Sequence, residues 1–362
     1  MPASFQFNGT QIAHGYTQME GVWRYGDARV SVHVVARSIS RPVWERLREG
    51  PFAARVLAVF EHACDLVTPD DCVVALVLPQ IGDGPLNIVV DGRPGDFAAV
   101  RPGMPAWLEG RRLEVGGLEI VLERAVVWEP RPDWDRLRAR RDGIVASLPH
   151  LWALSVCYAP ASSFLTLARE WVGGPSRPVA TVSASGSLAS VAREGAEALR
   201  MGWEGNSGQL REGAAQLAGL GRGLTPAGDD FLTGVMLWAW LAHSNPREFC
   251  RALVAAAIPR TMTLSAAFLR AAAEGECSAP WHRVLAALEG GAEEVLAASI
   301  RQVVACGATS GADTLAGFLW MGSPVRIGSE QGCAGFADKN EASASVKVCL
   351  GLTSSLPNAF LC

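Results

Sequence analysis

The chain has 362 residues, of which 49% are hydrophobic and 19% charged, and its formal net charge is −4. This length is more than twice the roughly 150 residues of a typical domain, so two domains are expected, and the composition is too apolar for a disordered protein. The weak negative charge provides no global basic surface for nucleic acid or an anionic membrane, which favours a small-molecule partner.

Lysine is almost absent from the sequence. All 32 positive charges are arginine except Lys339 and Lys347. The first 338 residues therefore lack the lysine of a P-loop, the conserved lysine of a protein kinase and any Schiff-base lysine. Anion binding in this part of the chain requires arginine, backbone N–H groups or a metal ion.

Three features predict a cytoplasmic protein without a membrane partner. The nine cysteines contain no CxxC pair, which is typical of free thiols in a reducing compartment. The N-terminal residues lack the charged and then apolar pattern of a signal peptide. The most apolar stretch, residues 231–242, is shorter than the roughly 20 residues that span a bilayer.

The first part of the chain is predicted to be rich in β-strands. Residues 43–66 carry apolar side chains at helical spacing and predict one or two helices. Strands are predicted at residues 28–36, 72–78, 86–90 and 113–128. The predicted fold class is therefore α+β, with a mixed, β-rich N-terminal domain over residues 1–130 that forms a small barrel or a curled sheet.

From about residue 135 the apolar periodicity is helical and predicts an all-α domain over residues 131–324, with function in the loops between helices. Predicted helices cover residues 134–148, 163–171, 188–203, 209–220, 231–243, 246–258, 265–274, 281–288, 293–306 and 314–321. Residues 325–362 differ, since arginine stops at Arg326 while both lysines and three of the nine cysteines follow it. This segment is predicted to be a disordered tail or an altered reading frame, and the sequence leaves both explanations open.

One pattern, G-x-D-x-L-x-G, occurs twice in the predicted helical domain, at residues 228–234 and 311–317. Each copy follows small turn residues and a hydroxyl residue, as at a junction between a loop and a helix. Such a junction leaves backbone N–H groups unpaired at the positive end of the helix dipole and can receive a phosphate or carboxylate. Two junctions that face each other would form a cradle for oxyanions.

The aspartates of the two motifs have two interpretations. Asp229, Asp230 and Asp313 could hold Mg²⁺, with a substrate phosphate completing its coordination. Alternatively, each aspartate caps its own helix, and the glycines only allow tight turns or close packing.

Two arginines stand in positions that suit an anion. Arg260 could contact a phosphate or carboxylate, with hydroxyl donors at Thr263 and Ser265, or it is a solvated residue before a capped helix. Arg222, between Gly221 and Gly223, has the same two interpretations.

These motifs resemble the AllH-type family, which is associated with oxamate carbamoyltransferase. The resemblance rests on residues 221–234, 263–265 and 309–317, with a weaker upstream element at residues 84–88, and it covers roughly residues 25–322. It implies one subunit of a multi-subunit enzyme of purine- or allantoin-derived nitrogen catabolism. Such an enzyme exchanges a carbamoyl group between oxalurate and phosphate to give oxamate and carbamoyl phosphate, and its activity is expected to require the partner subunits.

The motifs and the resemblance together predict the site. Asp230, Asp313 and Thr309 are the predicted catalytic residues, and Asp229, Asp230 and Asp313 are the predicted Mg²⁺ ligands. The predicted binding residues for phosphate or substrate are Gly221, Arg222, Gly223, Thr225, Gly228, Arg260, Thr263, Ser265, Ser310 and Gly311. The alternative is a non-catalytic scaffold or regulatory subunit that binds a nucleotide or an acyl phosphate. A nucleotide-dependent kinase or ligase is disfavoured by the missing lysine.

Overall fold

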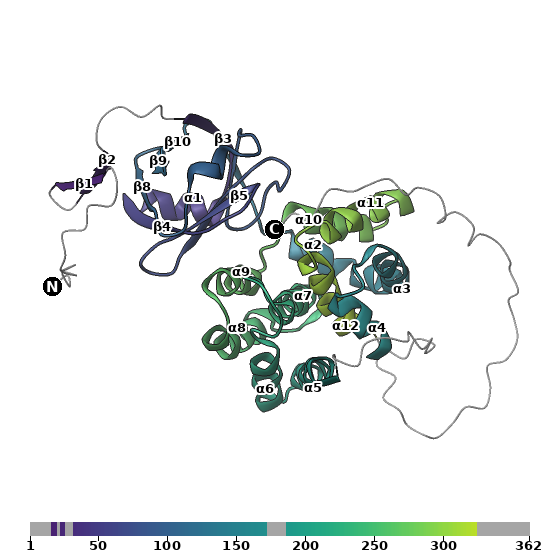
Figure 1. The fold of residues 1–362 in the computed structure, drawn as a ribbon. Helices are drawn as coiled ribbons and strands as arrows, with labels where there is room; N and C mark the ends of the chain where they lie inside the picture. Colours follow the sequence, from purple (N-terminus) through teal and green to yellow (C-terminus); the bar gives the residue numbers. More distant parts are fainter. Residues whose placement is uncertain (1–15, 20–21, 26–31, 172–185, 324–362) are drawn as a thin grey trace, which may run out of the picture.

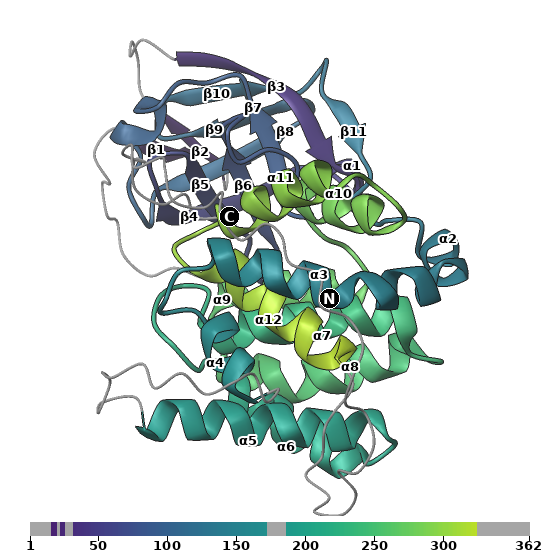
Figure 2. The same ribbon diagram turned by 90° about the vertical axis from the view of Figure 1, so that its right-hand side faces the viewer.

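The computed structural model describes residues 16–19, 22–25, 32–171 and 186–323 (Figure 1). The tail predicted at residues 325–362 lies outside these ranges. Residues 32–128 form a barrel, and residues 134–323 form a helical region packed against it (Figure 2). The predicted α+β class is confirmed. Within the described ranges, no helix has both the length and the apolar character needed to cross a bilayer.

The barrel is a single curled sheet. Among the described residues the strand order is β10-β9-β8-β4-β5-β6-β7-β3-β11, and a parallel pairing of β10 with β3 closes the sheet on itself. Its strands are β3 (Val32–Ser40), β4 (Phe52–Val59), β5 (Ala63–Val67), β6 (Val73–Val77), β7 (Asn87–Val90), β8 (Pro105–Glu109), β9 (Arg112–Val115), β10 (Leu118–Val121) and β11 (Val126–Trp128). The helix α1 (Arg41–Arg48) follows β3, and a short 3₁₀ helix covers Asp96–Ala99. Before the barrel, β1 (Tyr16–Met19) and β2 (Val22–Tyr25) pair as antiparallel strands.

Strands β5, β6 and β7 are buried on both faces. Cys64 and Leu66 of β5 point into the barrel core, whereas Ala63 and Val67 contribute to other apolar clusters outside it. A strand alternates its side chains between the two faces of the sheet, so Asp65 lies on the outer face with Ala63 and Val67. This outer face is the one that meets the helical region.

The prediction of helices throughout residues 43–66 is wrong after α1. Gly50 and Pro51 end the helix, and the following residues form β4 and β5. Apolar residues at positions 52, 56 and 60 are four apart. This spacing places them on one face of a helix, but it is also a multiple of the two-residue repeat of a strand. Burial in β4 alternates along Phe52–Val59, which is the strand period. The predicted strand at 113–128 is three strands, with Gly116 and Gly117 in the first turn, both at positive φ.

The helical region confirms the predicted all-α character. Its helices are α2 (Trp134–Ala139), α3 (Arg141–Tyr158), α4 (Phe164–Trp171), α5 (Gly186–Trp203), α6 (Ser207–Leu217), α7 (Ala227–Ala242), α8 (Pro246–Ala257), α9 (Thr263–Ala273), α10 (Ala279–Leu288), α11 (Glu293–Val304) and α12 (Ser310–Gly322). The helices α7 and α12 begin at residues 227 and 310, four residues before the predicted starts, so both motifs lie in first helical turns.

The two motif helices cross in the centre of the helical region (Figure 2). A Cβ atom on Gly234 of α7 would overlap the carbonyl oxygen of Thr314 in α12. Reciprocally, a Cβ atom on Gly317 of α12 would overlap the carbonyl oxygen of Phe231 in α7. These positions correspond in the two motifs, so the helices cross about a local pseudo-twofold axis. The last position of each motif is glycine because the two helix backbones touch there and leave no room for a side chain.

The barrel and the helical region are joined by apolar and backbone contacts. Val67 and Val73, at the turn between β5 and β6, form a cluster with Leu264 and Ala267 of α9. The backbone N–H of Ala279 donates to the carbonyl of Asp83 at 2.9 Å, which ties the start of α10 to the loop before β7. The apolar cluster therefore holds α9 against β5 and β6, and the backbone hydrogen bond holds the start of α10 beside the loop before β7.

Candidate functional site at the contact between barrel and helices

The two motif junctions lie against each other. The hydroxyls of Thr225, before α7, and Ser310, at the start of α12, are 3.1 Å apart and both residues are buried. A single hydrogen bond therefore links two loops that are far apart in the sequence. The structure brings Thr225 and Ser310 together, as the hypothesis of facing junctions requires.

Asp229 connects three segments of the helical region. Its Oδ1 accepts a hydrogen bond from the backbone N–H of Gly219 at 3.0 Å. Its Oδ2 accepts hydrogen bonds from the hydroxyls of Thr261 and of Ser265, the latter at 2.7 Å. Burial raises the pKa of Asp229 above its usual value, and these three hydrogen bonds oppose that rise. The carboxylate therefore holds the loop before α7 to the start of α9.

Asp313 caps a helix other than its own. Its Oδ1 accepts a hydrogen bond from the backbone N–H of Phe164, the first residue of α4, at 2.6 Å. Burial raises the pKa of Asp313 to about 7, although the Thr309 side chain and the Phe164 amide favour the charged form.

For Asp229 and Asp313 the hypothesis that each aspartate caps its own helix is wrong, because their carboxylates accept hydrogen bonds from other segments. Pro226 and Thr309 occupy the N-cap positions of α7 and α12, and neither makes a side-chain cap. Asp230, in the first turn of α7, is half-buried, and its predicted catalytic role stays a prediction.

Two of the amides predicted to bind an anion already have partners. Gly228 N donates to Leu220 O at 2.8 Å, and Gly311 N donates to Cys306 O at 3.1 Å. By contrast, the backbone amides of residues 221–225 make no hydrogen bond within the described part of the chain. Gly221 and Gly223 adopt φ angles of 127° and 99°, which side chains disfavour, so the glycines set the shape of this loop. The donors that remain for a ligand are concentrated in residues 221–225, the glycine loop.

The predicted arginines flank this loop. Arg222 lies within it, is exposed, and forms no ion pair with a described residue. Arg260 is also exposed, and its carbonyl packs against Gly219, where a Cβ atom would not fit. Thr263 is half-buried at the start of α9, whereas the Ser265 hydroxyl is engaged by Asp229. The structure therefore places the 260–265 segment beside the glycine loop.

The described residues do not include a built metal site. No group of three or more histidine, cysteine, aspartate or glutamate side chains is arranged to hold a metal ion in the described ranges. Both oxygens of Asp229 accept protein hydrogen bonds, which a metal ion would have to displace. Mg²⁺ at Asp229, Asp230 and Asp313 stays a prediction, and no chemical step below depends on it.

A cavity of about 220 Å³ lies between the barrel and the helical region, beside the glycine loop. Gly223, Leu224 and Thr225 line it together with Leu264 and Phe268 of α9. The barrel contributes Phe60, Ala63, Asp65, Ala75, Val77, Ile81 and Asn87 to the opposite wall. No arginine, lysine or histidine is among these described lining residues. The cavity is thus an apolar space with a few polar groups, which is the usual composition of a small-molecule site.

Asp65 and Asn87 are the polar side chains of the barrel wall, and neither was predicted. Asp65 is 5% exposed and makes no hydrogen bond or ion pair with any described residue. Asn87 donates from Nδ2 to Gly82 O at 2.9 Å, which orients its amide. The sequence offered one signal for Asp65, since it is the single charged residue inside the apolar run 63–67. Asn87 belongs to the upstream element at residues 84–88.

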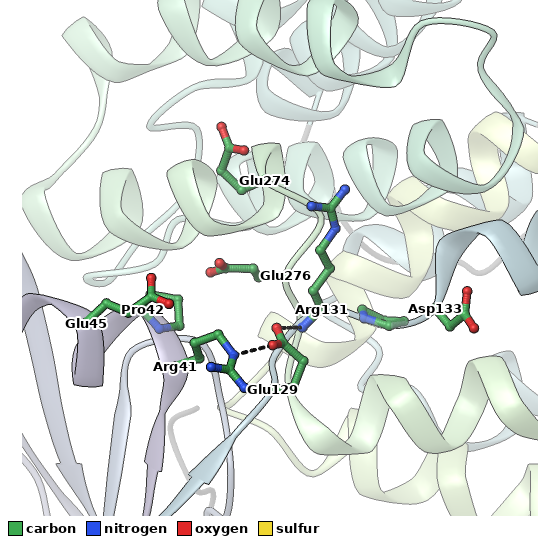
Figure 3. Close-up of a pocket in the computed structure, with 9 residues that line it drawn as sticks. Arg41, Pro42, Glu45, Glu129, Arg131, Asp133, Glu274 and Glu276 are labelled. Carbon is green, nitrogen blue, oxygen red and sulfur yellow. Dashed lines mark hydrogen bonds and ion pairs between the residues drawn. The ribbon is translucent and has the colours of Figure 1, made fainter.

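A second cavity, of about 490 Å³, lies between α1 and the loop that joins α9 to α10 (Figure 3). Arg41 and Arg131 line it with five acidic residues, namely Glu45, Glu129, Asp133, Glu274 and Glu276. The Arg41 guanidinium pairs with Glu129 at 2.5 Å. Burial and the neighbouring carboxylates raise the pKa of Glu276 to about 7. This excess of carboxylates repels a phosphate or carboxylate ligand, so the cavity does not suit an oxyanion.

The fold is an α+β arrangement in which a β-barrel is followed by a helical region, with a cavity where the two meet. Residues 217–321 match the family model described as oxamate carbamoyltransferase subunit AllH. Residues 35–127 match the model of the AllH family N-terminal domain. The two matches together span more than half of the chain, and the chain belongs to the AllH family of oxamate carbamoyltransferase subunits. No solved structure matches it.

Proposed function

We propose that this carbamoyltransferase subunit binds the substrates of carbamoyl transfer, carbamoyl phosphate and oxamate, where the glycine loop meets the barrel. The observation that carries the proposal is the set of unpaired backbone amides in residues 221–225, next to the exposed Arg222 and at the edge of the 220 Å³ cavity. Both family models cover this contact, since Gly223 and Asp65 lie within the matched ranges.

The glycine loop suits the anionic end of a substrate. Backbone N–H groups that precede a helix bind phosphate, and the dipole of α7 adds to this attraction. Arg222 supplies a positive charge that can form two parallel hydrogen bonds with a phosphate or carboxylate. The buried pair of hydroxyls at Thr225 and Ser310 places further donors beside the same loop.

The size of the cavity favours a small metabolite over a nucleotide. Its volume is about 220 Å³. Drug-sized ligands occupy sites of roughly 300–1,000 Å³. A carbamoyl group or the amide end of oxamate fits this space, and the phosphate remains outside it at the glycine loop.

In the transfer, the amide nitrogen of oxamate forms a bond to the carbamoyl carbon and loses one proton, which the departing phosphate takes up. The bond between that carbon and the phosphate oxygen breaks, and its electron pair leaves with the phosphate. The reverse reaction starts from oxalurate and phosphate. The donors of the glycine loop and Arg222 stabilise the charge on the departing phosphate, which is an electrostatic contribution to catalysis. We place this chemistry in the assembled enzyme, with the partner subunits, in the catabolism of allantoin-derived nitrogen.

The test is the substitution Arg222→Gln, assayed in the full chain purified with its partner subunits. Hydrogen bonds to a charged group are worth about 1.5–3 kcal/mol, so we expect the KM for carbamoyl phosphate to rise roughly ten- to hundredfold. Arg211→Gln is the matched control, since Arg211 is an exposed arginine of α6 without an ion pair among the described residues. Its KM should equal that of the wild type.

Two results would contradict the proposal. Equal KM values for Arg222→Gln and Arg211→Gln would show that carbamoyl phosphate does not bind at the glycine loop. Carbamoyl phosphate binding without turnover, even in the presence of the partner subunits, would instead indicate a scaffold or regulatory subunit.

A further inference from the structure

The outer face of the barrel carries an acid and an amide in one row. Asp65 of β5 is in register with Ala75 of β6, and Ala75 is in register with Asn87 of β7. Residues in register on adjacent strands point to the same face, and two strand spacings separate the Asp65 and Asn87 backbones by roughly 10 Å. The small Ala75 between them leaves the space of the cavity open.

Asp65 is a buried residue whose carboxyl faces the cavity without a protein partner among the described residues. Asp65 is 5% exposed, lines the cavity, and has no hydrogen bond or ion pair with a described residue. Burying a polar group without a partner costs free energy, so such groups are normally paired. The stability of the fold gives no reason to keep an acid here, because an apolar residue of similar size would pack against the same neighbours at lower cost.

The surroundings of Asp65 indicate what kind of group would pair with it. No cationic side chain lines the cavity among the described residues, so a phosphate or second carboxylate would find no counter-charge there. A neutral group with N–H donors would satisfy the carboxyl oxygens. The Asn87 amide, held by Gly82, offers further hydrogen-bonding capacity on the same wall.

We propose that Asp65 and Asn87 form a recognition site for a carboxamide or carbamoyl group, and that the ligand bridges the barrel and the glycine loop. The proposal rests on the proposed function, because it assigns the end of the substrate opposite to the phosphate-binding loop. A carboxyl group and a carboxamide can form two parallel hydrogen bonds, one in each direction, when the acid holds its proton. Burial raises the pKa of Asp65 to about 7, which makes the protonated form available near neutral pH.

The experiment measures ligand binding by isothermal titration calorimetry with the full chain assembled with its partner subunits. The probes are oxamate and oxalate. In oxalate, a second carboxylate replaces the amide of oxamate. We expect the wild type to bind oxamate at least tenfold more tightly than oxalate. In Asp65→Leu this preference should disappear, and in Ala75→Leu, which fills the cavity without a change of charge, oxamate binding should be lost.

Two controls separate recognition from folding. The first control, Asp71→Asn, changes an exposed aspartate in the turn between β5 and β6. Asp71 has a φ of 59°, a conformation that asparagine also tolerates. This variant should bind oxamate like the wild type. The thermal unfolding midpoint of Asp65→Leu should equal or exceed that of the wild type. A purely structural role for Asp65 would instead lower that midpoint.

The failures of the two proposals are distinguishable on the same samples. Oxamate binding that is unchanged in Asp65→Leu, or absent in the wild type, overturns the assignment of Asp65. Carbamoyl transfer with an unchanged KM for oxamate in Asp65→Leu overturns that assignment and leaves the proposed function intact. Absence of transfer in the wild-type assembly overturns the proposed function.

Discussion

Two buried aspartates of the helical region show how a motif residue can serve the fold and the site together. Asp229 accepts hydrogen bonds from Gly219, Thr261 and Ser265, and thereby holds Gly219, which precedes the glycine loop, to the start of α9. Asp313 fixes the start of α4. The sequence motif singled out these aspartates as candidate functional residues. It could not predict their hydrogen-bond partners, which come from segments that are distant in the sequence.

The pKa of Asp313 leads to a prediction at the same scale. Burial raises the pKa of Asp313 to about 7 in the folded protein, above its ordinary value of 3.8. The folded state therefore holds the proton between these values, and stability is lost as the pH rises from about 4 to about 7. Asp313→Asn keeps an acceptor for the Phe164 amide but removes this titration.

We expect the free energy of unfolding of Asp313→Asn, relative to the wild type, to increase by about 2–3 kcal/mol from pH 5 to pH 8. Urea denaturation at the two pH values measures this difference. Asp65 and Glu276 contribute a slope of the same sign in both proteins, so the comparison isolates Asp313. A difference that does not change with pH would show that Asp313 is ionised throughout this range.

At the scale of elements, the crossing of α7 and α12 depends on two glycines. Gly234→Ala would press a methyl group onto the Thr314 carbonyl, where neither backbone can move without disturbing the buried centre of the helical region. Overpacking of this kind costs about 1–3 kcal/mol. We expect Gly234→Ala to lower the free energy of unfolding by at least about 2 kcal/mol in chemical denaturation.

Gly143→Ala is the matched control for that substitution. Gly143 also lies inside a helix, α3, but has open space around the position of a Cβ atom. Alanine should stabilise this helix by about 0.5–1 kcal/mol. Similar destabilisation by both substitutions would contradict the interpretation of the helix crossing.

The helices were predictable because each is amphipathic or buried over several turns and is bounded by glycine, proline or polar residues. The strands β4 and β5 were not predictable, because the spacing of Phe52, Val56 and Phe60 is compatible with both the helical and the strand period. Only the contacts of β4 with β5 and β8 decide between them. The helix starts at Ala227 and Ser310 were missed because the first turns contain small and polar residues without an apolar period.

At the scale of the whole molecule, the site exists only because the barrel packs against the helical region. The cluster of Val67 and Val73 with Leu264 and Ala267 brings β5 to the start of α9, and the cavity lies beside this cluster. The glycine loop, where we propose that the anion binds, could be predicted from its glycines. The opposite wall could not, because Asp65 reaches it through contacts between residues far apart in the sequence, without a motif of its own.

The most direct test of this account is a crystal structure of the full chain, assembled with its partner subunits, in the presence of oxamate and phosphate. We predict that phosphate contacts the backbone amides of residues 221–225 and Arg222, and that the oxamate amide lies within hydrogen-bond distance of Asp65. Ligand density in the acidic cavity beside Glu276, or only on the partner subunits, would contradict the placement of the site.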